Sequence, residues 1–206
     1  MLEYYFLIMV TGDLFRMDDS QLSQHKTYGF CIQMIMKIYI PIKTTDVLDS
    51  RVEKSLLMQT LPTELILVPN VPLSTCKRKG EFEGRDKIVE LVKRQKDEII
   101  VESDADAQQL FADNLQCQLD FLNNNSDVGV VALFWKDGGF TPPYSTHVKM
   151  TCTMWRKKVL INMPQLDYEG ACYSHCHCMA YKDAVEKQGY KMCYIDPIRR
   201  VRHLDL

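Results

Sequence analysis

The stretch EIIVESDADAQQL, residues 98–110, holds the feature on which the fold assignment depends. A short apolar run, Ile99–Val101, leads into two carboxylates one residue apart, Asp104 and Asp106, and a helix-like pattern follows. A plain turn can place aspartates there. A divalent cation that carries a phosphate can also require them, because residues i and i+2 at a strand end point the same way and two carboxylates there repel each other without a cation. The flanking segments must therefore show whether the two aspartates form a plain turn or a cation site.

The composition is that of a globular domain. The chain has 206 residues, of which 46% are hydrophobic and 25% charged, enough for one sizeable core. A formal net charge of −2 gives no overall basic field, so we expect no stable binding to nucleic acid. No apolar run reaches the roughly 18 residues that cross a bilayer, so no membrane span is expected. Eight cysteines without a secretory signal indicate reduced thiols and a cytoplasmic location.

Short apolar runs alternate with helical patterns from Met36 onward. Strands are predicted at residues 37–42, 64–68, 98–101 and 128–135, and helices at 46–59, 84–94 and 107–122. This alternation is typical of βαβ units and predicts an α/β domain with a mostly parallel sheet. Residues 1–35 show no clear period, so we interpret them as an N-terminal extension and residues 36–206 as the functional domain.

The pattern changes character after Lys136. A strand is predicted from His147 to Trp155, and a helix from Lys182 to Gln188 that ends at Gly189, a residue suited to a C-cap. A last short strand is predicted from Tyr190 to Ile195.

Polar residues follow three of the predicted strands, where ligands bind in parallel sheets. These residues are Lys43-Thr44-Thr45, Asn70 and Asp104-Ala105-Asp106. Because carboxyl ends of parallel strands lie at one edge, we expect all three groups to face the same crevice.

Five segments together resemble a known family. They are KIYIPIKTTDVLDSRVEKSLLMQTLPTELILVPN (37–70), ESDAD (102–106), VGVVALF (128–134), CTMWRKKVL (152–160) and GYKMCYIDPIRRVRHL (189–204). In order and spacing they resemble the GT-A glycosyltransferases of the family-2-like, nucleotide-diphospho-sugar transferase group, in a small phage or bacterial form. The resemblance implies a single Rossmann-like GT-A domain that transfers a hexosyl or pentosyl group.

The resemblance also implies a metal site. ESDAD is similar to the family's DxD motif, so Asp104 and Asp106 would hold Mn²⁺ or Mg²⁺ together with the ribose and diphosphate of a donor, expected to be a UDP-sugar. His203 would be the third protein ligand, since it follows the last strand as the family's histidine does.

The resemblance further implies a nucleotide site. Its residues would be Thr44, Thr45, Asn70, Arg85 and Asp104. Asn70 departs from the acidic residue that the family often has near that place.

One departure concerns the catalytic base. The family usually has an acidic pair before its final helix, whereas residues 170–178 of this chain read GACYSHCHC. An inverting reaction needs a base within hydrogen-bond reach of the acceptor hydroxyl, and a neutral imidazole can take that proton near pH 7. The candidates are His177, His175, Asp167 and Glu169. A retaining reaction would need no such base.

The same cluster supports other functions. Zinc takes four nitrogen or sulfur ligands. The cluster could supply them from Cys172, His175, Cys176, His177 and Cys178, with Cys193 as a further ligand. The usual CxxC…CxxC spacing of zinc sites is absent. A zinc-stabilised interaction module is therefore one alternative to a metal-dependent glycosyltransferase that acts on a glycan or a modified nucleobase. An inactive nucleotide-binding homologue is another. A nucleotidyltransferase is a third, although Lys43-Thr44-Thr45 is not a Gly-rich phosphate loop.

Overall fold

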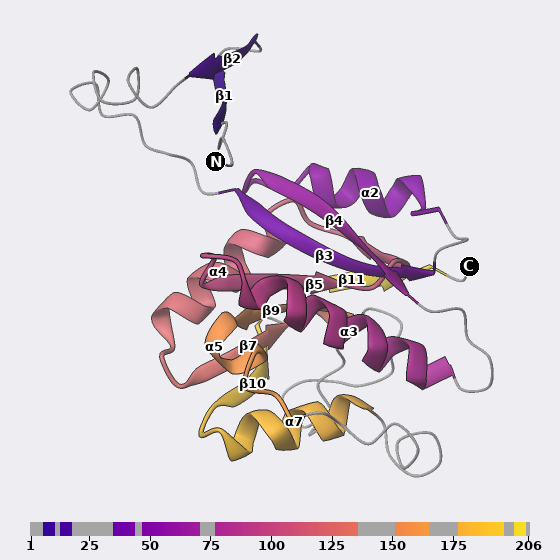
Figure 1. Ribbon diagram of the computed structural model, residues 1–206, viewed down its shortest axis with the longest axis vertical. Helices are drawn as coiled ribbons and strands as arrows, with labels where there is room; N and C mark the ends of the chain where they lie inside the picture. The colour runs from indigo at the N-terminus through magenta and orange to yellow at the C-terminus, as the bar shows by residue number, and fades with distance from the viewer. Residues whose placement is uncertain are drawn as a thin grey trace. The chain divides into compact units, whose positions relative to one another are not determined.

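The structure is a computed structural model that describes most of the chain beyond residue 34 (Figure 1). The described residues are 6–10, 13–17, 35–43, 47–70, 77–135, 151–164, 177–195 and 200–204. The chain divides into two units, Met1–Met34 and Ile35–Leu206. The described part of the first unit is an antiparallel hairpin of β1 (Phe6–Val10) and β2 (Asp13–Met17).

The described strands of the second unit build a central six-stranded sheet in the order β10-β7-β9-β5-β3-β4. Its strands are β3 (Met36–Lys43), β4 (Thr63–Asn70), β5 (Ile99–Ser103), β7 (Val128–Ala132), β9 (Cys152–Arg156) and β10 (Lys191–Tyr194). Strand β3 pairs in parallel with β4 and β5, and β7 pairs in parallel with β10. Strand β9 runs antiparallel between β5 and β7. The predicted α/β domain with a mostly parallel sheet is confirmed.

Helices cover both faces of this sheet. The described helices are α2 (Ser50–Leu57), α3 (Lys77–Lys93), α4 (Asn114–Asn124), α5 (Lys157–Leu160) and α7 (His177–Lys187). Helices α2 and α4 pack on one face, and α3, α5 and α7 on the other; Figure 1 shows α2 on one side of the sheet and α3 and α7 on the opposite side. Alternate residues of β3 serve the two cores, because Ile38 and Ile40 face α2 whereas Tyr39 faces α3.

Two helices begin elsewhere than predicted. Helix α2 begins at Ser50 rather than at residue 46, because Asp49 is its N-cap and accepts a 2.8 Å hydrogen bond from the Arg51 backbone N–H. Helix α3 begins at Lys77 rather than at residue 84, so the basic run at residues 77–79 is helical. In this helix Ile88 and Val92 are buried, whereas Leu91 is exposed.

The helix predicted from Ala107 was wrong in its first two turns. Residues Ala107–Gln109 form a short strand, β6, and α4 begins only at Asn114. Strand β6 pairs antiparallel with β11 (Arg200–His203), which also pairs in parallel with β8 (Phe134–Trp135). The strand predicted at 128–135 is accordingly divided at Leu133 between the central sheet and this second one.

The C-cap predicted at Gly189 is confirmed. This glycine has φ +82°, and its N–H donates to the Glu186 carbonyl at 2.9 Å, which closes α7. The helix begins at His177, earlier than predicted. Among the described residues, no helix is both long and apolar enough to cross a lipid bilayer.

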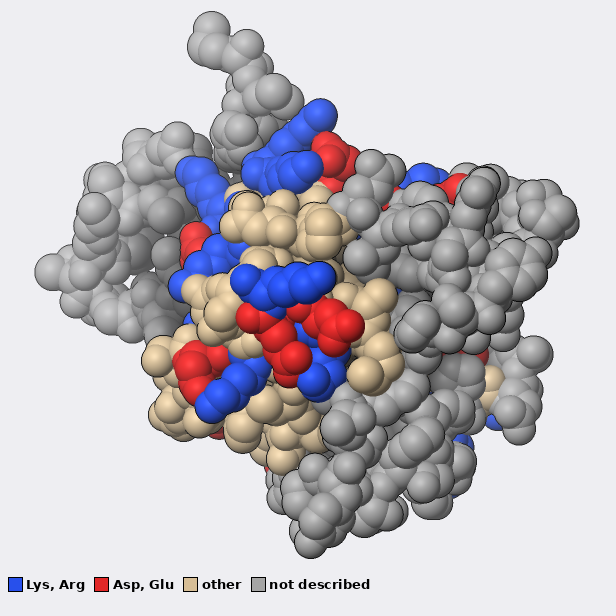
Figure 2. All heavy atoms as spheres, turned by 90° about the horizontal axis from the view of Figure 1, so that it is seen from below, with Lys and Arg blue, Asp and Glu red and all other residues tan. Residues whose placement is uncertain are grey.

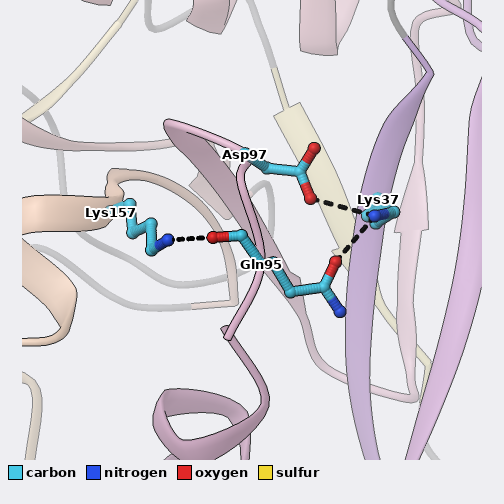
Figure 3. Close-up of polar contacts among 4 residues, drawn as sticks. All are labelled: Lys37, Gln95, Asp97 and Lys157. Atoms are coloured by element: carbon cyan, nitrogen blue, oxygen red, sulfur yellow. Dashed lines mark hydrogen bonds and ion pairs between the residues drawn. The ribbon is translucent and has the colours of Figure 1, made fainter. Parts of the chain in front are cut away.

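A polar cluster fixes the loop between α3 and β5 at the amino end of the sheet (Figure 3). Lys37 Nζ on β3 donates to Gln95 Oε1 at 2.7 Å and pairs with Asp97 Oδ2 at 3.0 Å. Lys157 Nζ, at the start of α5, donates to the Gln95 backbone carbonyl. Side chains from β3 and α5 thus hold this loop at the edge of the sheet where β5 begins.

Candidate functional site

Three parallel strands end at one edge of the central sheet, as the sequence predicts. Strand β3 is in register with β4, with Lys43 opposite Asn70, and it pairs with β5 through Tyr39 and Glu102. In Figure 1 the arrowheads of β3 and β4 point to this edge, and α3 begins there. In open α/β sheets this carboxyl edge is where ligands bind.

The acidic turn lies at the end of β5. The Asp104 N–H donates to the Thr151 carbonyl at 2.9 Å, and the Ala107 N–H donates to the Asp104 carbonyl at 3.2 Å. The backbone of Asp104-Ala105-Asp106 is therefore fixed at both ends, and both carboxylates belong to half-buried residues.

The pairing of β6 with β11 brings the backbone of His203 to this turn. His203 is opposite Ala107 in the register, and the Leu204 N–H donates to the Asp106 carbonyl at 2.8 Å. The structure describes the backbone of His203 and not its side chain. Two residues far apart in the sequence, Asp106 and His203, are thus neighbours along paired strands.

The donors at this turn suit a divalent cation. Two carboxylates on one turn are ligand types that Mn²⁺ accepts, and Mg²⁺ commonly binds through one or two carboxylates. Among the side chains that the structure describes, no group of three or more His, Cys, Asp or Glu could hold a metal. The His203 side chain is outside that set, so its role as a third ligand stays a prediction.

Arg85 forms a buried ion pair directly behind the acidic turn. Its Nε atom lies 2.6 Å from Glu102 Oε1, and the two side chains are 4% and 2% exposed. Burial raises the pKa of the Glu102 carboxyl, an effect that Arg85 opposes. Burial lowers the pKa of the Arg85 guanidinium, but the combined attraction of Glu102, Tyr181, Asp104 and Cys178 outweighs it, so the net direction is upward.

The same guanidinium also contacts helix α7. Its Cζ atom lies 5.0 Å from the centre of the Tyr181 ring, within the range of a cation–π interaction. The Tyr181 ring meets Trp155 edge to face, with centroids 6.2 Å apart, and Trp155 Nε1 donates to Thr153 Oγ1 at 2.9 Å. A chain of contacts therefore runs from α3 through α7 to β9.

The sequence interpretation did not single out Glu102 or Tyr181. One signal was available, since Glu102 follows the apolar run Ile99–Val101 in a strand predicted to be buried, and a buried carboxylate needs a partner. The identity of that partner could not be found from the pattern.

Comparison with solved structures identifies the fold. The chain is similar to a mannosyltransferase from Pyrobaculum calidifontis in complex with GDP-Man and Mn²⁺, with a TM-score of 0.60, 14% identity and coverage of 82% of this chain and 56% of that one. The chain has the GT-A fold. It is also similar to Staphylococcus aureus TarS, with a TM-score of 0.55, 12% identity and coverage of 82% of this chain and 60% of that one.

A third similar GT-A structure is glucosyl-3-phosphoglycerate synthase from Mycobacterium tuberculosis in complex with Mn²⁺, UDP and phosphoglyceric acid. Its TM-score is 0.54 at 12% identity, over 84% of this chain and 72% of that one. The chain thus spans little more than half the length of the first of these structures. No protein-family profile and no curated protein sequence matches it. At these identities the likeness establishes the GT-A fold alone.

Several predicted site residues lie outside what the structure describes. Residues Thr44, Thr45, Asp167, Glu169 and His175 are outside the described ranges. Asn70 is described only by its backbone, as the last residue of β4, and His177 only as the first residue of α7. The predicted roles of these residues at the GT-A site stay predictions.

A cavity lies beside α3, and Arg85 and Tyr181 are among its lining residues. It has a volume of about 320 Å³, is open between α3 and residues 160–164, and is lined by both acidic and basic side chains, including Arg85, Glu90 and Lys93. Figure 2 shows the face that carries α7, where the described acidic and basic side chains are intermingled. A cavity lined by both acidic and basic side chains is a poor binding site for a diphosphate, which favours basic groups or a metal ion.

Proposed function

We propose that this chain is a metal-dependent glycosyltransferase that moves a hexosyl or pentosyl group from a nucleotide-diphosphate donor to an acceptor. The observation that carries the proposal is the acidic turn, Asp104 to Asp106, at the carboxyl edge of a GT-A sheet with the His203 backbone paired beside it. The solved structures of the same fold include complexes with GDP-Man or UDP and Mn²⁺. We propose a small enzyme of phage or bacterial type that works in the cytoplasm.

Asp104, Asp106 and His203 would hold Mn²⁺ or Mg²⁺. The ion would supply positive charge at the diphosphate, where negative charge develops as the glycosyl bond breaks. The hydrogen bonds to Thr151 and from Leu204 support this role, because they fix the turn that carries both carboxylates.

The nucleoside would lie along the ends of β3 and β4. Thr44 and Thr45 follow β3 in sequence, and Asn70 ends β4. Lys87 Nζ, on α3, donates to the Pro69 carbonyl at 2.6 Å and so ties the end of β4 to the helix. We propose a UDP-sugar as donor, bound at this corner.

The proton of the acceptor hydroxyl needs a destination if the reaction inverts the anomeric carbon. We place one of His177, His175, Asp167 and Glu169 there. The acceptor oxygen bonds to the anomeric carbon, the bond to the diphosphate breaks, and the base takes the hydroxyl proton. A retaining course would not use this base. The acceptor would be a glycan or a modified nucleobase.

The test is a calorimetric titration of UDP into the protein with and without Mn²⁺. We expect binding that requires Mn²⁺ and is lost in Asp106→Ala. Asp120→Ala is the matched control, because Asp120 is an exposed carboxylate on α4, and it should bind UDP as the unchanged protein does. Binding of UDP that is equal in both variants, or absent from the unchanged protein, would overturn the proposed site.

The alternatives give different results in the same experiments. UDP binding without sugar transfer to any acceptor tested would indicate an inactive homologue. Stoichiometric zinc in the purified protein would favour the interaction module. Cys178 gives that module little support, because it is buried in the core beside Tyr181 and Val185, whereas Cys172, His175 and Cys176 are outside the described residues.

A further inference from the structure

Arg85 joins three secondary-structure elements through one side chain. It extends from α3, pairs with Glu102 of β5 at 2.6 Å, and lies over the Tyr181 ring of α7 at 5.0 Å. The side chain is 4% exposed. The exposed pair Lys93–Glu90 on the same helix, at 2.7 Å, joins only residues of that helix.

Both partners of Arg85 lie next to parts of the proposed site. Glu102 is two residues before Asp104 in the chain, and the backbone continues directly from β5 into the acidic turn. Tyr181 lies about one helical turn after His177, the first residue of α7. The guanidinium therefore links the strand that leads to the proposed metal ligands with the helix that begins at a proposed base.

The chemistry of these contacts favours a geometric role. A buried ion pair contributes little net stability, since well-packed apolar groups of similar volume serve as well or better. A guanidinium is planar and carries its charge over several atoms, so one side chain can pair with a carboxylate and lie over a ring face at the same time, which ties both partners to α3. Trp155, Ile88 and Val92 pack around the pair, and its two side chains are only 4% and 2% exposed, so solvent screens the ion pair little, although Arg85 and Tyr181 also line the cavity beside α3.

We propose that Arg85 is a positioning residue that holds the acidic turn after β5 in a fixed place relative to the first turns of α7. The inference rests on the proposed function, which supplies the reason for such a link. Arg85 would then have a role other than the nucleotide contact that the resemblance to GT-A transferases implies.

The first test uses metal-free protein, so that it does not depend on the proposed function. Hydrogen exchange would be followed at the amides of Asp104 and Ala107, which donate to the carbonyls of Thr151 and Asp104. Arg85→Lys keeps the charge but loses the flat guanidinium, and we expect both amides to exchange at least tenfold faster. The Lys93→Met variant, which breaks the exposed pair, should exchange as the unchanged protein does.

The second test measures Mn²⁺ affinity by electron paramagnetic resonance. Changes to groups that orient metal ligands typically lower affinity by about 10- to 100-fold, and we expect a loss in that range for Arg85→Lys and for Tyr181→Leu. The conservative variant Tyr181→Phe keeps the ring and should recover most of the affinity. A role confined to stability would lower the unfolding midpoint and leave the Mn²⁺ affinity of the folded variants unchanged.

Two results together would overturn the inference. In folded Arg85→Lys, both amides would exchange at the rate of the unchanged protein, and the Mn²⁺ affinity would equal that of the unchanged protein. If that variant does not fold, the comparison of Tyr181→Leu with Tyr181→Phe decides by the same two measurements. If the unchanged protein binds no Mn²⁺, the proposed function fails, and the exchange of the two amides alone decides whether Arg85 positions the turn.

Discussion

Arg85 and Glu102 meet inside the protein, with Nε 2.6 Å from Oε1 and both side chains almost fully buried. One comes from a helix and the other from the strand that leads to the acidic turn. The pair is therefore a contact between the outer layer of the fold and the strand on which the proposed site is built, and it makes a direct prediction about stability.

Removing one member of this pair should destabilise the protein strongly. We expect Glu102→Ala to lower the free energy of unfolding by about 3–5 kcal/mol, because the guanidinium stays buried without its partner. The double variant Arg85→Met/Glu102→Leu should recover most of the loss, since two apolar groups leave no uncompensated charge. Urea unfolding of both variants measures this. A double variant no more stable than Glu102→Ala would contradict the explanation.

The Cys152 thiol should be inert in the folded protein. This residue is fully buried at the start of β9, and burial raises the pKa of its thiol to about 12, so almost no thiolate forms near pH 8. Alkylation by iodoacetamide, followed by mass spectrometry of the peptides, should label Cys152 only after urea is added. Cys117 is half-buried on α4 and should be labelled earlier. Equal labelling of the two in native protein would be contrary to the burial seen at Cys152.

The stabilisation of α2 by its N-cap residue, Asp49, should weaken in acid. Hydrogen bonds from the Arg51 side chain and backbone lower the pKa of Asp49 to about 2. Because the folded pKa is below the unfolded one, the contribution of Asp49 to stability is present above about pH 4 and is lost as the pH falls toward 2. Asp49→Asn can still cap the helix but does not titrate. Thermal unfolding between pH 2 and pH 6 should show the wild-type advantage over this variant shrinking with acid. A constant difference would argue against the pKa shift.

The cluster of Lys37, Gln95 and Asp97 should matter for stability and not for the site (Figure 3). Lys37→Met removes both contacts of the Lys37 ammonium, and we expect a loss of about 1 kcal/mol, since the groups are partly exposed. UDP binding in the presence of Mn²⁺ should not change, because the cluster is at the amino edge of the sheet and the acidic turn at the carboxyl edge. Weakened UDP binding in this variant would show that the two edges are coupled.

The apolar runs in the sequence, and the polar residues that end them, predicted the main strands of this fold. The strands β3, β4 and β5, and the C-cap at Gly189, follow from local composition, because a buried strand must be apolar and a left-handed residue is most often glycine. The places of Asp104 and Asp106 at a strand end followed from the same pattern. The predicted first residues of the helices were less accurate. Asp49, for example, is identified as the N-cap of α2 only by its hydrogen bond from the Arg51 N–H.

The pairing partners were decided by the tertiary structure. Residues Ala107–Gln109 carry a helix-like pattern, yet they form a strand, because Arg200–His203 returns from the end of the chain to pair with them. Three residues are too few to establish a strand period against the helical pattern that continues to residue 122, and no local signal indicates a partner so distant in the sequence. The contacts of Arg85 with Glu102 and Tyr181 arise in the same way. Local hydrophobicity predicts the buried strands, but it does not predict the burial of Arg85 and Glu102. The contacts between buried residues depend on the tertiary fold of the whole chain.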